Sequence, residues 1–156
     1  MSELFINKAK AVAVTGHRRL YDDYNKKDVI QTFSSLIEIG YDTFLVGMAV
    51  GFDTECFHVL EELRKEFSIK IIECIPCRCQ DETFSVSQKR EYRRMIEVAD
   101  EKIVLQEEYD KKCMLKRNMF MVDNCSTLVA YMRKESGGTA FTVNYARKKN
   151  VYVLNI

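Results

Sequence analysis

Proline and tryptophan are almost missing from this sequence, and neither sign of charge dominates it. Proline occurs once, at Pro76, and tryptophan does not occur. The formal net charge is +1, so the chain lacks the general positive field of proteins that bind nucleic acid or anionic membranes over much of their surface. A local basic patch stays compatible with this balance. The longest apolar runs, such as residues 127–132, are far too short to span a bilayer, and we expect no membrane partner.

The first residues lack the apolar core and the cleavage site of a secretory signal peptide. Six cysteines in a chain without such a signal indicate reduced thiols rather than a disulfide framework. We therefore expect a cytoplasmic protein. Residues 1–156, of which 47% are hydrophobic, are expected to fold as a single domain around one core.

The two common phosphate-binding motifs are missing as well. Only Gly16 follows the first expected strand, so the G-x-G-x-x-G of dinucleotide enzymes is absent, and no G-x-x-x-x-G-K-[ST] occurs. Cys74, Cys77 and Cys79 are closely spaced, but no second close pair of Cys or His completes four zinc ligands. No thiol has a recognisable base partner. We expect neither a metal nor a cofactor.

Short apolar segments alternate with amphipathic segments along the chain. Strands are predicted at residues 9–15, 43–46, 69–75, 101–105, 126–132 and 151–156. Helices are predicted at residues 26–39, 53–67, 86–99 and 113–124, and after Thr139 as far as Lys149. Apolar strands that alternate with helices are typical of a parallel sheet covered on both faces. We predict an α/β fold, a three-layer Rossmann-like parallel sheet of about six strands with helices on both faces.

Glycine-containing loops follow the first, second and fifth expected strands and should meet at the carboxyl edge of the sheet, where such folds bind ligands. In the second loop, Gly47 and Gly51 would allow a close backbone approach. Asp53 then either caps the next helix, which is the simpler interpretation, or also holds a ribose hydroxyl. In the third loop, residues 136–139 offer a phosphate cradle, and the alternative is an ordinary turn capped by Thr139.

Four segments resemble the SLOG superfamily of Rossmann-like nucleotide-ligand proteins, and within it the YpsA-type family of small bacterial proteins. They are residues 14–18 (V-T-G-H-R), 47–53 (G-M-A-V-G-F-D), 117–123 (R-N with M-V-D) and 137–146 (G-G-T, then T-V-N-Y-A). The resemblance implies a nucleotide-derived small molecule as partner, and it alone implies a homo-oligomer. The ligand-binding residues we predict are Gly16, Arg18, Gly47, Met48, Gly51, Asp53, Arg117, Asn118, Gly137, Gly138 and Thr139.

These residues have expected roles. The loop at 137–139 would hold a phosphate through backbone N–H groups and a hydroxyl. Arg18 and Arg117 would supply positive charge, and residues 47–53 would line the sugar or base. The apolar helix 114–122 is interpreted as facing the core, with an oligomer interface as the alternative.

Two relatives within the superfamily imply other activities. The DNA-processing protein DprA, which binds single-stranded DNA, has a G-G-A-x-G-x-D loop similar to residues 47–53. The LOG enzymes, which release the base from cytokinin nucleoside monophosphates, have an M-x-x-R-K-x-x-M helix similar to residues 114–121. The place of their catalytic glutamate falls on Thr142 or Asn144, and neither is a carboxylate. Glu135 and Asp123 are the acidic residues that could substitute.

We therefore predict a ligand sensor or binding protein and do not favour an enzyme. The first alternative is a LOG-like phosphoribohydrolase or N-glycosidase that acts on a nucleotide or an NAD-like compound. The second is a DprA-like protein that binds single-stranded DNA, with nucleic acid as a less favoured partner.

Overall fold

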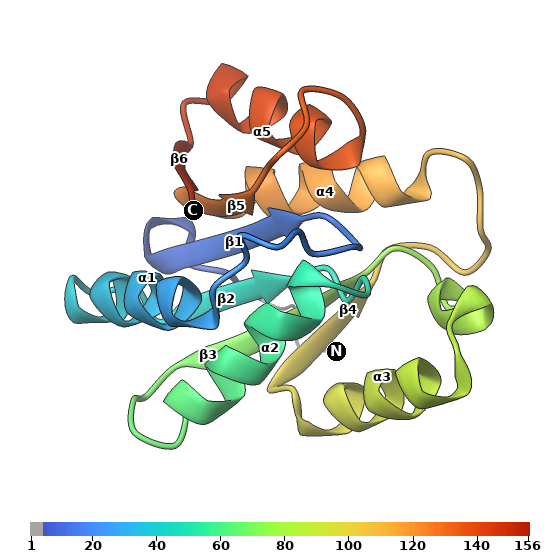
Figure 1. Ribbon diagram of the computed structural model, residues 1–156, viewed down its shortest axis with the longest axis horizontal. Helices are drawn as coiled ribbons and strands as arrows, with labels where there is room; N and C mark the ends of the chain where they lie inside the picture. The colour runs from blue at the N-terminus through green and yellow to red at the C-terminus, as the bar shows by residue number, and fades with distance from the viewer. Residues whose placement is uncertain (1–4) are drawn as a thin grey trace.

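The computed structural model describes residues 5–156. Residues 1–4, which belong to the N-terminal stretch without a signal-peptide pattern, lie outside the described residues. Six parallel strands form one sheet in the order β4-β3-β2-β1-β5-β6 (Figure 1). They are β1 (Ala11–Gly16), β2 (Thr43–Val46), β3 (Lys70–Ile75), β4 (Glu101–Val104), β5 (Thr127–Tyr131) and β6 (Tyr152–Asn155). The predicted Rossmann-like fold class is confirmed.

Five helices connect the strands, and all five were predicted. They are α1 (Lys26–Glu38), α2 (Phe52–Leu63), α3 (Val86–Val98), α4 (Cys113–Asp123) and α5 (Gly138–Lys148). Within residues 5–156, no helix is long and apolar enough to cross a membrane. The prediction missed two short 3-10 helices, η1 (Lys8–Lys10) and η2 (Gln80–Thr83). Because the Asn7 side chain accepts a hydrogen bond from the Ala9 amide and starts η1, β1 begins two residues later than predicted.

The sheet separates two apolar layers. Val12 and Val14 of β1 pack in the layer under α1, α2 and α3, whereas Ala11 and Ala13 pack in the layer under α4 and α5. This alternation follows from the two-residue period of a strand. The side of β1 that faces α4 and α5 therefore carries smaller side chains than the side that faces α1, α2 and α3.

The order of the strands reverses beside β1. From β1 the chain adds β2, β3 and β4 in one direction, and β5 then returns to the other side of β1. Gly16, the last residue of β1, is in register with Tyr131, the last residue of β5. The loops that follow these two strands therefore diverge from one level at the carboxyl edge, which is where open α/β sheets form their ligand crevice.

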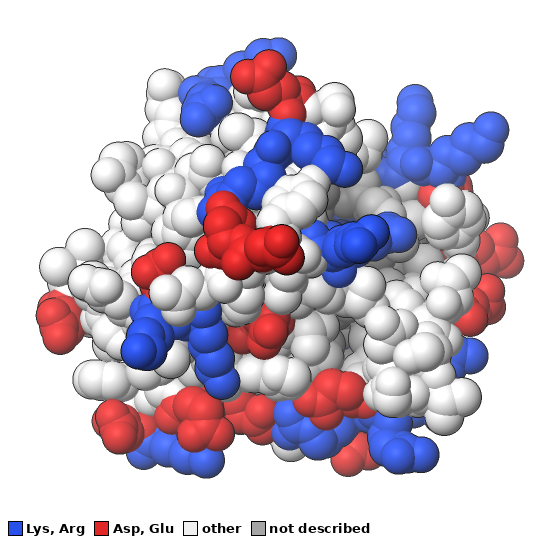
Figure 2. Space-filling view, in the orientation of Figure 1, with Lys and Arg blue, Asp and Glu red and all other residues white. Residues whose placement is uncertain are grey.

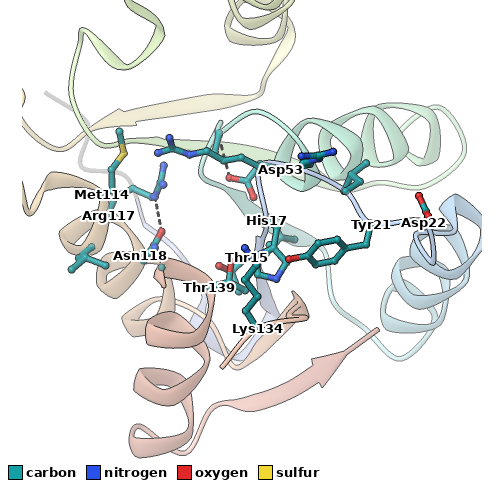
Figure 3. A pocket seen from close by; sticks show the side chains of 18 residues that line it. Thr15, His17, Tyr21, Asp22, Asp53, Met114, Arg117, Asn118, Lys134 and Thr139 are labelled. Carbon is teal, nitrogen blue, oxygen red and sulfur yellow. Dashed lines mark hydrogen bonds between the residues drawn. The ribbon is translucent and has the colours of Figure 1, made fainter. Parts of the chain in front are cut away.

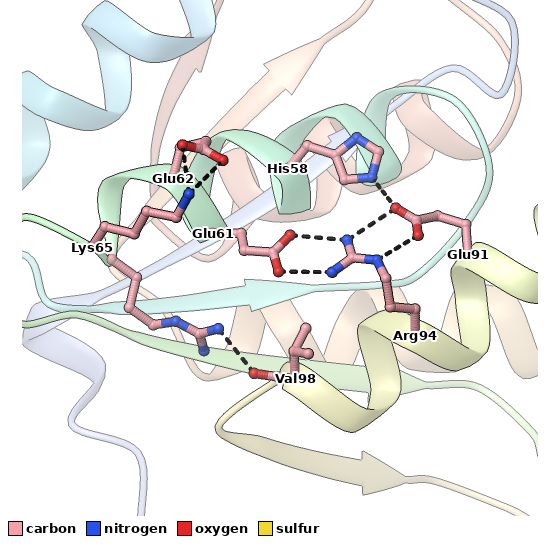
Figure 4. Close-up of polar contacts among 8 residues, drawn as sticks. His58, Glu61, Glu62, Lys65, Glu91, Arg94 and Val98 are labelled. Carbon is pink, nitrogen blue, oxygen red and sulfur yellow. Dashed lines mark hydrogen bonds and ion pairs between the residues drawn. The ribbon is translucent and has the colours of Figure 1, made fainter.

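A network of ion pairs holds α3 beside α2 (Figure 4). Arg94 donates two hydrogen bonds to Glu61, at 2.8 and 2.9 Å, and two more to Glu91. His58 lies 2.5 Å from the same Glu91 carboxylate. The hydrogen bond from Arg94 is the main cause that lowers the pKa of Glu91 to about 2. At neutral pH the network is therefore charged, and it joins two helices that sit side by side over the sheet.

The loop after β2 is locked against the loop after β1. The Phe52 amide donates to the His17 carbonyl at 3.1 Å. Gly51 has φ 85°, and a Cβ at this position would lie 2.2 Å from the Arg18 carbonyl oxygen. A Cβ on Gly16 would lie 2.4 Å from the Phe52 ring. Both glycines are therefore required by contacts within the protein.

Replacing Gly51 with alanine is expected to destabilise the protein far more than replacing Gly40. Both glycines have positive φ, so each substitution introduces about 1–3 kcal/mol of backbone strain. Only at Gly51 would the new Cβ collide with backbone, since no atom of residues 5–156 lies within 4 Å of a Cβ built on Gly40. We expect Gly51→Ala to lower the free energy of unfolding, measured in urea, by at least about 2 kcal/mol more than Gly40→Ala. Equal losses would contradict the tight packing of these loops.

Candidate functional site

A cavity of about 870 Å³ opens at the carboxyl edge, beside the reversal in strand order (Figure 3). Its walls come from the loop after β1, from the start of α2, from α4 and from the loop between β5 and α5. The lining residues are Val14, Thr15, Gly16, His17, Arg18, Arg19, Leu20, Tyr21, Asp22, Ala49, Asp53, Met114, Leu115, Arg117, Asn118, Lys134, Gly138 and Thr139. The structure thus brings together segments that lie more than 100 residues apart in the sequence.

The cavity is positively charged although the whole chain is nearly neutral. Four cationic side chains line it, and the two carboxylates in its wall are Asp22 and Asp53. The cations are Arg18, Arg19, Arg117 and Lys134. Figure 2 shows Lys and Arg side chains beside a hollow on the side of the molecule where the strands end. This local excess of positive charge favours an anionic ligand.

His17 joins the loops after β1 and β5. Its Nε2 accepts a hydrogen bond of 2.8 Å from the Arg133 amide, so the proton of the neutral ring is on Nδ1. Burial is the main cause that lowers the pKa of His17, and the positive charges of Lys134 and Arg133 lower it further. The imidazole is therefore neutral at physiological pH and connects the two loops.

Arg117 lies beneath the cavity, with only 4% of its surface exposed. Its Nη1 donates to the Gly47 carbonyl and, at 3.5 Å, to the Cys74 carbonyl, while its Nε donates to Asn118 Oδ1 at 2.8 Å. A Cβ on Gly47 would lie 2.8 Å from the guanidinium carbon. Arg117 therefore joins the ends of β2 and β3 to α4, and most of its hydrogen-bonding capacity serves the protein itself.

Asp53 is a buried carboxylate in the wall of the cavity, 5% exposed. Its Oδ2 accepts a hydrogen bond of 3.1 Å from the Ala49 amide. Burial raises the pKa of Asp53 to about 6, although Arg117 and Arg18 act in the opposite direction. A small change in local charge is enough to protonate or ionise this group near neutral pH.

The interpretation of Asp53 as a helix cap is wrong. α2 begins at Phe52 with Gly51 as its N-cap, and no side chain of the described residues caps it. The positive φ of Gly51 turns the chain so that Asp53, in the first helical turn, reaches back to the Ala49 amide in the preceding loop.

The start of α5 is open to the cavity. Gly137, with φ 94°, is the N-cap, and within residues 5–156 no side chain caps the helix, so the alternative of a cap by Thr139 is wrong. Gly138 and Thr139 both line the cavity. Apart from the two neighbouring residues and the backbone of α5 itself, no atom of the described residues lies within 4 Å of a Cβ built on Gly138. The first amide groups of a helix have no intrahelical partners, and here they adjoin unoccupied space.

The other predicted ligand residues divide into two groups. Seven line the cavity, namely Gly16, Arg18, Asp53, Arg117, Asn118, Gly138 and Thr139. Four do not, and their constraints are internal: Gly47, Met48, Gly51 and Gly137. Met48 is 1% exposed and has φ 66°, and its side chain is packed in the apolar layer.

The predicted ligand residues leave out eleven of the lining residues, including Lys134, Leu115 and Ala49, although Ala49 lies in the loop 47–53 that was expected to line the sugar or base. Lys134 precedes the glycine pair of the β5–α5 loop by a few residues, and a cation at that spacing is a usable signal for an anion site. Ala49 and Leu115 have no chemical signature and are identified only by the fold.

The positions that correspond to the LOG glutamate carry no acid into the cavity. The Thr142 hydroxyl is buried and donates to the Gly138 carbonyl at 2.8 Å. Asn144 is exposed and lies outside the lining. Asp123 accepts a hydrogen bond from the Tyr145 hydroxyl at 2.8 Å, and neither Asp123 nor Glu135 lines the cavity.

The cysteines do not assemble into a metal site in the described part of the chain. Among residues 5–156, no group of three or more His, Cys, Asp or Glu side chains is arranged to hold a metal ion. The Cys77 and Cys79 sulfur atoms lie 3.4 Å apart, but they form only a pair.

Comparison with known protein families shows to which family this chain belongs. The YpsA family model, described as the YspA SLOG family, matches residues 12–154. The chain belongs to this family. The match includes all five α-helices and all six strands apart from the first residue of β1 and the last residue of β6, so the sequence resemblance to the YpsA-type branch of the SLOG superfamily is confirmed.

This SLOG protein is also similar to individual proteins. It is 35% identical over 120 residues to an uncharacterised SPbeta prophage-derived protein, YoqJ, of Bacillus subtilis strain 168, covering 67% of this chain and 69% of that protein. The DNA processing protein A (DprA) of Streptococcus pneumoniae superposes with a TM-score of 0.69 at 21% identity, over 94% of this chain and 50% of that one. DprA of Helicobacter pylori gives 0.68 at 18% identity, over 94% and 65%. This SLOG chain thus spans about half and about two thirds of the two DprA chains, with which it shares the fold.

Arg117 is expected to matter for stability rather than only for ligand binding. Arg117→Ala would leave the Gly47 carbonyl without one donor and Asp53 without its nearest compensating charge. We expect a loss of about 3–5 kcal/mol in the free energy of unfolding, measured by denaturant titration. Arg18→Ala is the control, because Arg18 lines the same cavity but is exposed, and we expect a change within about 0.5 kcal/mol. If both variants were equally stable, Arg117 would not hold the strand ends together.

Proposed function

We propose that this SLOG protein binds a nucleotide-derived small molecule at the carboxyl edge of its sheet and acts as a ligand sensor or binding protein. The observation that carries the proposal is the positively charged cavity at the strand-order reversal, with the uncapped start of α5 in its wall. Crevices at this position are the usual ligand sites of open α/β sheets.

The phosphate of the ligand is assigned to the start of α5. Amide groups at a helix N-terminus and the associated dipole favour an anion. Gly138 leaves space for it, the Thr139 hydroxyl adds a donor, and Lys134 adds a positive charge in the same wall. Arg18 and Arg19 lie in the part of the wall formed by the loop after β1 and would neutralise further phosphate oxygens.

Binding without turnover is favoured because the cavity lacks the carboxylate that LOG-type chemistry places at Thr142 or Asn144. Cleavage of a base–ribose bond passes through an oxocarbenium-like state that a nearby carboxylate stabilises. Asp53 is a carboxylate in the cavity, but it is buried, bonded to the Ala49 amide and close to Arg117. We therefore propose that it shapes the charge of the site and does not act in catalysis.

Replacing Gly138 with aspartate is expected to abolish binding of AMP, used as the probe ligand. The new carboxylate would occupy the open space at the start of α5 and repel the phosphate. Gly138→Asn is the matched control, because asparagine has nearly the same shape without the charge. We expect Gly138→Asp to weaken AMP binding at least about ten-fold more than Gly138→Asn, measured by isothermal titration calorimetry. If the two variants bound AMP alike, the phosphate would not lie at α5.

Two further measurements distinguish the proposed function from its two alternatives. Release of free adenine from AMP or from an NAD-type compound, detected by chromatography, would indicate a phosphoribohydrolase or N-glycosidase. Tight binding of an oligothymidylate that falls steeply with salt would indicate single-strand binding, the property named for DprA of Helicobacter pylori. The proposal expects neither result.

Anion binding is expected to weaken as the pH rises through about 6, because Asp53 then gains its negative charge. Sulfate is the probe, since its own charge stays constant over this range. His17 titrates in the same direction, because its deprotonation removes a positive charge from the same wall. Asp53→Asn separates the two groups and should leave only the dependence due to His17. Titrations from about pH 5 to about pH 8 with an unchanged slope in Asp53→Asn would contradict a role for Asp53.

A further inference from the structure

A smaller cavity of about 190 Å³ adjoins the positively charged cavity at the carboxyl edge, here named the basic cavity. The two cavities share Arg18, Ala49 and Met114 as lining residues. The smaller one continues past the loop after β2 toward η2 and the start of α3. A molecule bound in the basic cavity would reach the smaller one by passing these three residues.

The two cavities differ in chemistry. Arg18 is the one ionisable side chain that the structure places in the wall of the smaller cavity, and the remaining wall is apolar or carries amide and hydroxyl groups. Phe84 forms part of this wall. Its ring is half-buried and packs edge-to-face on Tyr92, with ring centroids 5.6 Å apart. An aromatic side chain held in this way suits a planar, uncharged ring better than a second phosphate.

Gln80 fixes this wall to the rest of the site. Its Nε2 donates to the Gly47 carbonyl at 3.0 Å, and its Oε1 accepts from the Tyr92 hydroxyl at 3.1 Å. The same Gly47 carbonyl accepts from Arg117. The Gly47 carbonyl thus connects Arg117, which lines the basic cavity, with Gln80, which lines the smaller one. The ion pairs between Arg94 and Glu61 hold α3, which carries part of the smaller cavity's wall, beside α2 (Figure 4).

Two hydrogen-bonding groups on the wall are left for a ligand. Gln88 Oε1 accepts from the Ser85 amide at 2.9 Å in the capping box of α3. Its Nε2 donates to no atom of residues 5–156. The Thr83 hydroxyl likewise has no partner in the described chain. Such groups can contact the polar edge of a heterocyclic base while its face lies on Phe84.

We propose that the smaller cavity is a base subsite, which takes the nucleobase of the ligand whose phosphate binds at α5. The inference rests on the proposed function and adds that the ligand is recognised as a nucleotide rather than as a sugar phosphate. The base stacks on Phe84, its edge faces Gln88 and Thr83, and the linking sugar passes Arg18 and Met114. Gln80 acts as a positioning residue.

The test compares AMP with ribose 5-phosphate, which has the same phosphate and sugar but no base. Affinities are measured by isothermal titration calorimetry for the wild type, for Phe84→Leu and for Val86→Ala. Val86 lies outside the smaller cavity and is 76% exposed near the start of α3, so its variant is the matched control. Leucine keeps the apolar bulk of Phe84 and removes the ring on which a base stacks.

We expect the wild type and Val86→Ala to bind AMP at least about ten-fold more tightly than ribose 5-phosphate, as stacking of a base on an aromatic ring implies. Phe84→Leu should lose most of this preference while its affinity for ribose 5-phosphate stays the same. Thr83→Tyr is a second variant at an exposed position and should fill the cavity with the same result.

The other outcomes overturn either the base subsite or the proposed function. Equal affinity of the wild type for the two ligands, or an unchanged preference in Phe84→Leu and Thr83→Tyr, overturns the base subsite and leaves the phosphate site intact. A parallel loss of both affinities in Phe84→Leu also overturns it, because Phe84 would then act on the basic cavity. If the wild type binds neither AMP nor ribose 5-phosphate, the proposed function fails.

Discussion

The carboxyl edge of this protein is built on one buried cation, the guanidinium of Arg117. A charge removed from water is costly unless hydrogen bonds and an opposite charge compensate it. Here the carbonyls at the ends of β2 and β3 accept its hydrogen bonds, and Asp53 supplies the opposite charge. These contacts fix the ends of two strands to α4, and they fix the floor on which both cavities lie.

The same cation changes the explanation of the glycines after β2. Their spacing suggests a backbone that leaves space for a ligand, yet the space beside Gly47 is filled by Arg117 and that beside Gly51 by the Arg18 carbonyl. The protein itself therefore excludes side chains at both positions. Gly137 and Gly138, at the start of α5, have open space beside them instead, and of the two only Gly138 lines the cavity.

Most of the fold could be predicted from the sequence because local patterns determine it. Alternating apolar strands and amphipathic helices gave all six strands and five helices within a few residues, and the glycine loops indicated the correct edge of the sheet. The individual site residues depend on tertiary geometry instead. Whether Asp53 caps its helix or turns into the cavity depends on the φ of Gly51, and no local pattern in the sequence encodes that choice. The smaller cavity depends on η2, which is too short to show a periodicity.

Membership of the YspA SLOG family and the shared fold with DprA leave wide freedom in function, because function depends on the site grafted onto a fold. In this chain the glycine-rich start of α5 is present, and the place of the LOG glutamate falls on Thr142 or on the exposed Asn144. The Thr142 hydroxyl donates to the Gly138 carbonyl and so stabilises the first turn of α5. The uncapped start of α5 is the feature of the cavity on which the proposed phosphate site rests.

The strand order also has a consequence for biosynthesis. β1 becomes an interior strand only when β5 pairs with it, and their register joins Gly16 to Tyr131. Until β5 has been synthesised and paired, one edge of β1 has no partner strand. An unpaired apolar edge is the usual starting point of aggregation. The ligand site needs the loops after both strands, so its two sides come together only when β5 pairs with β1.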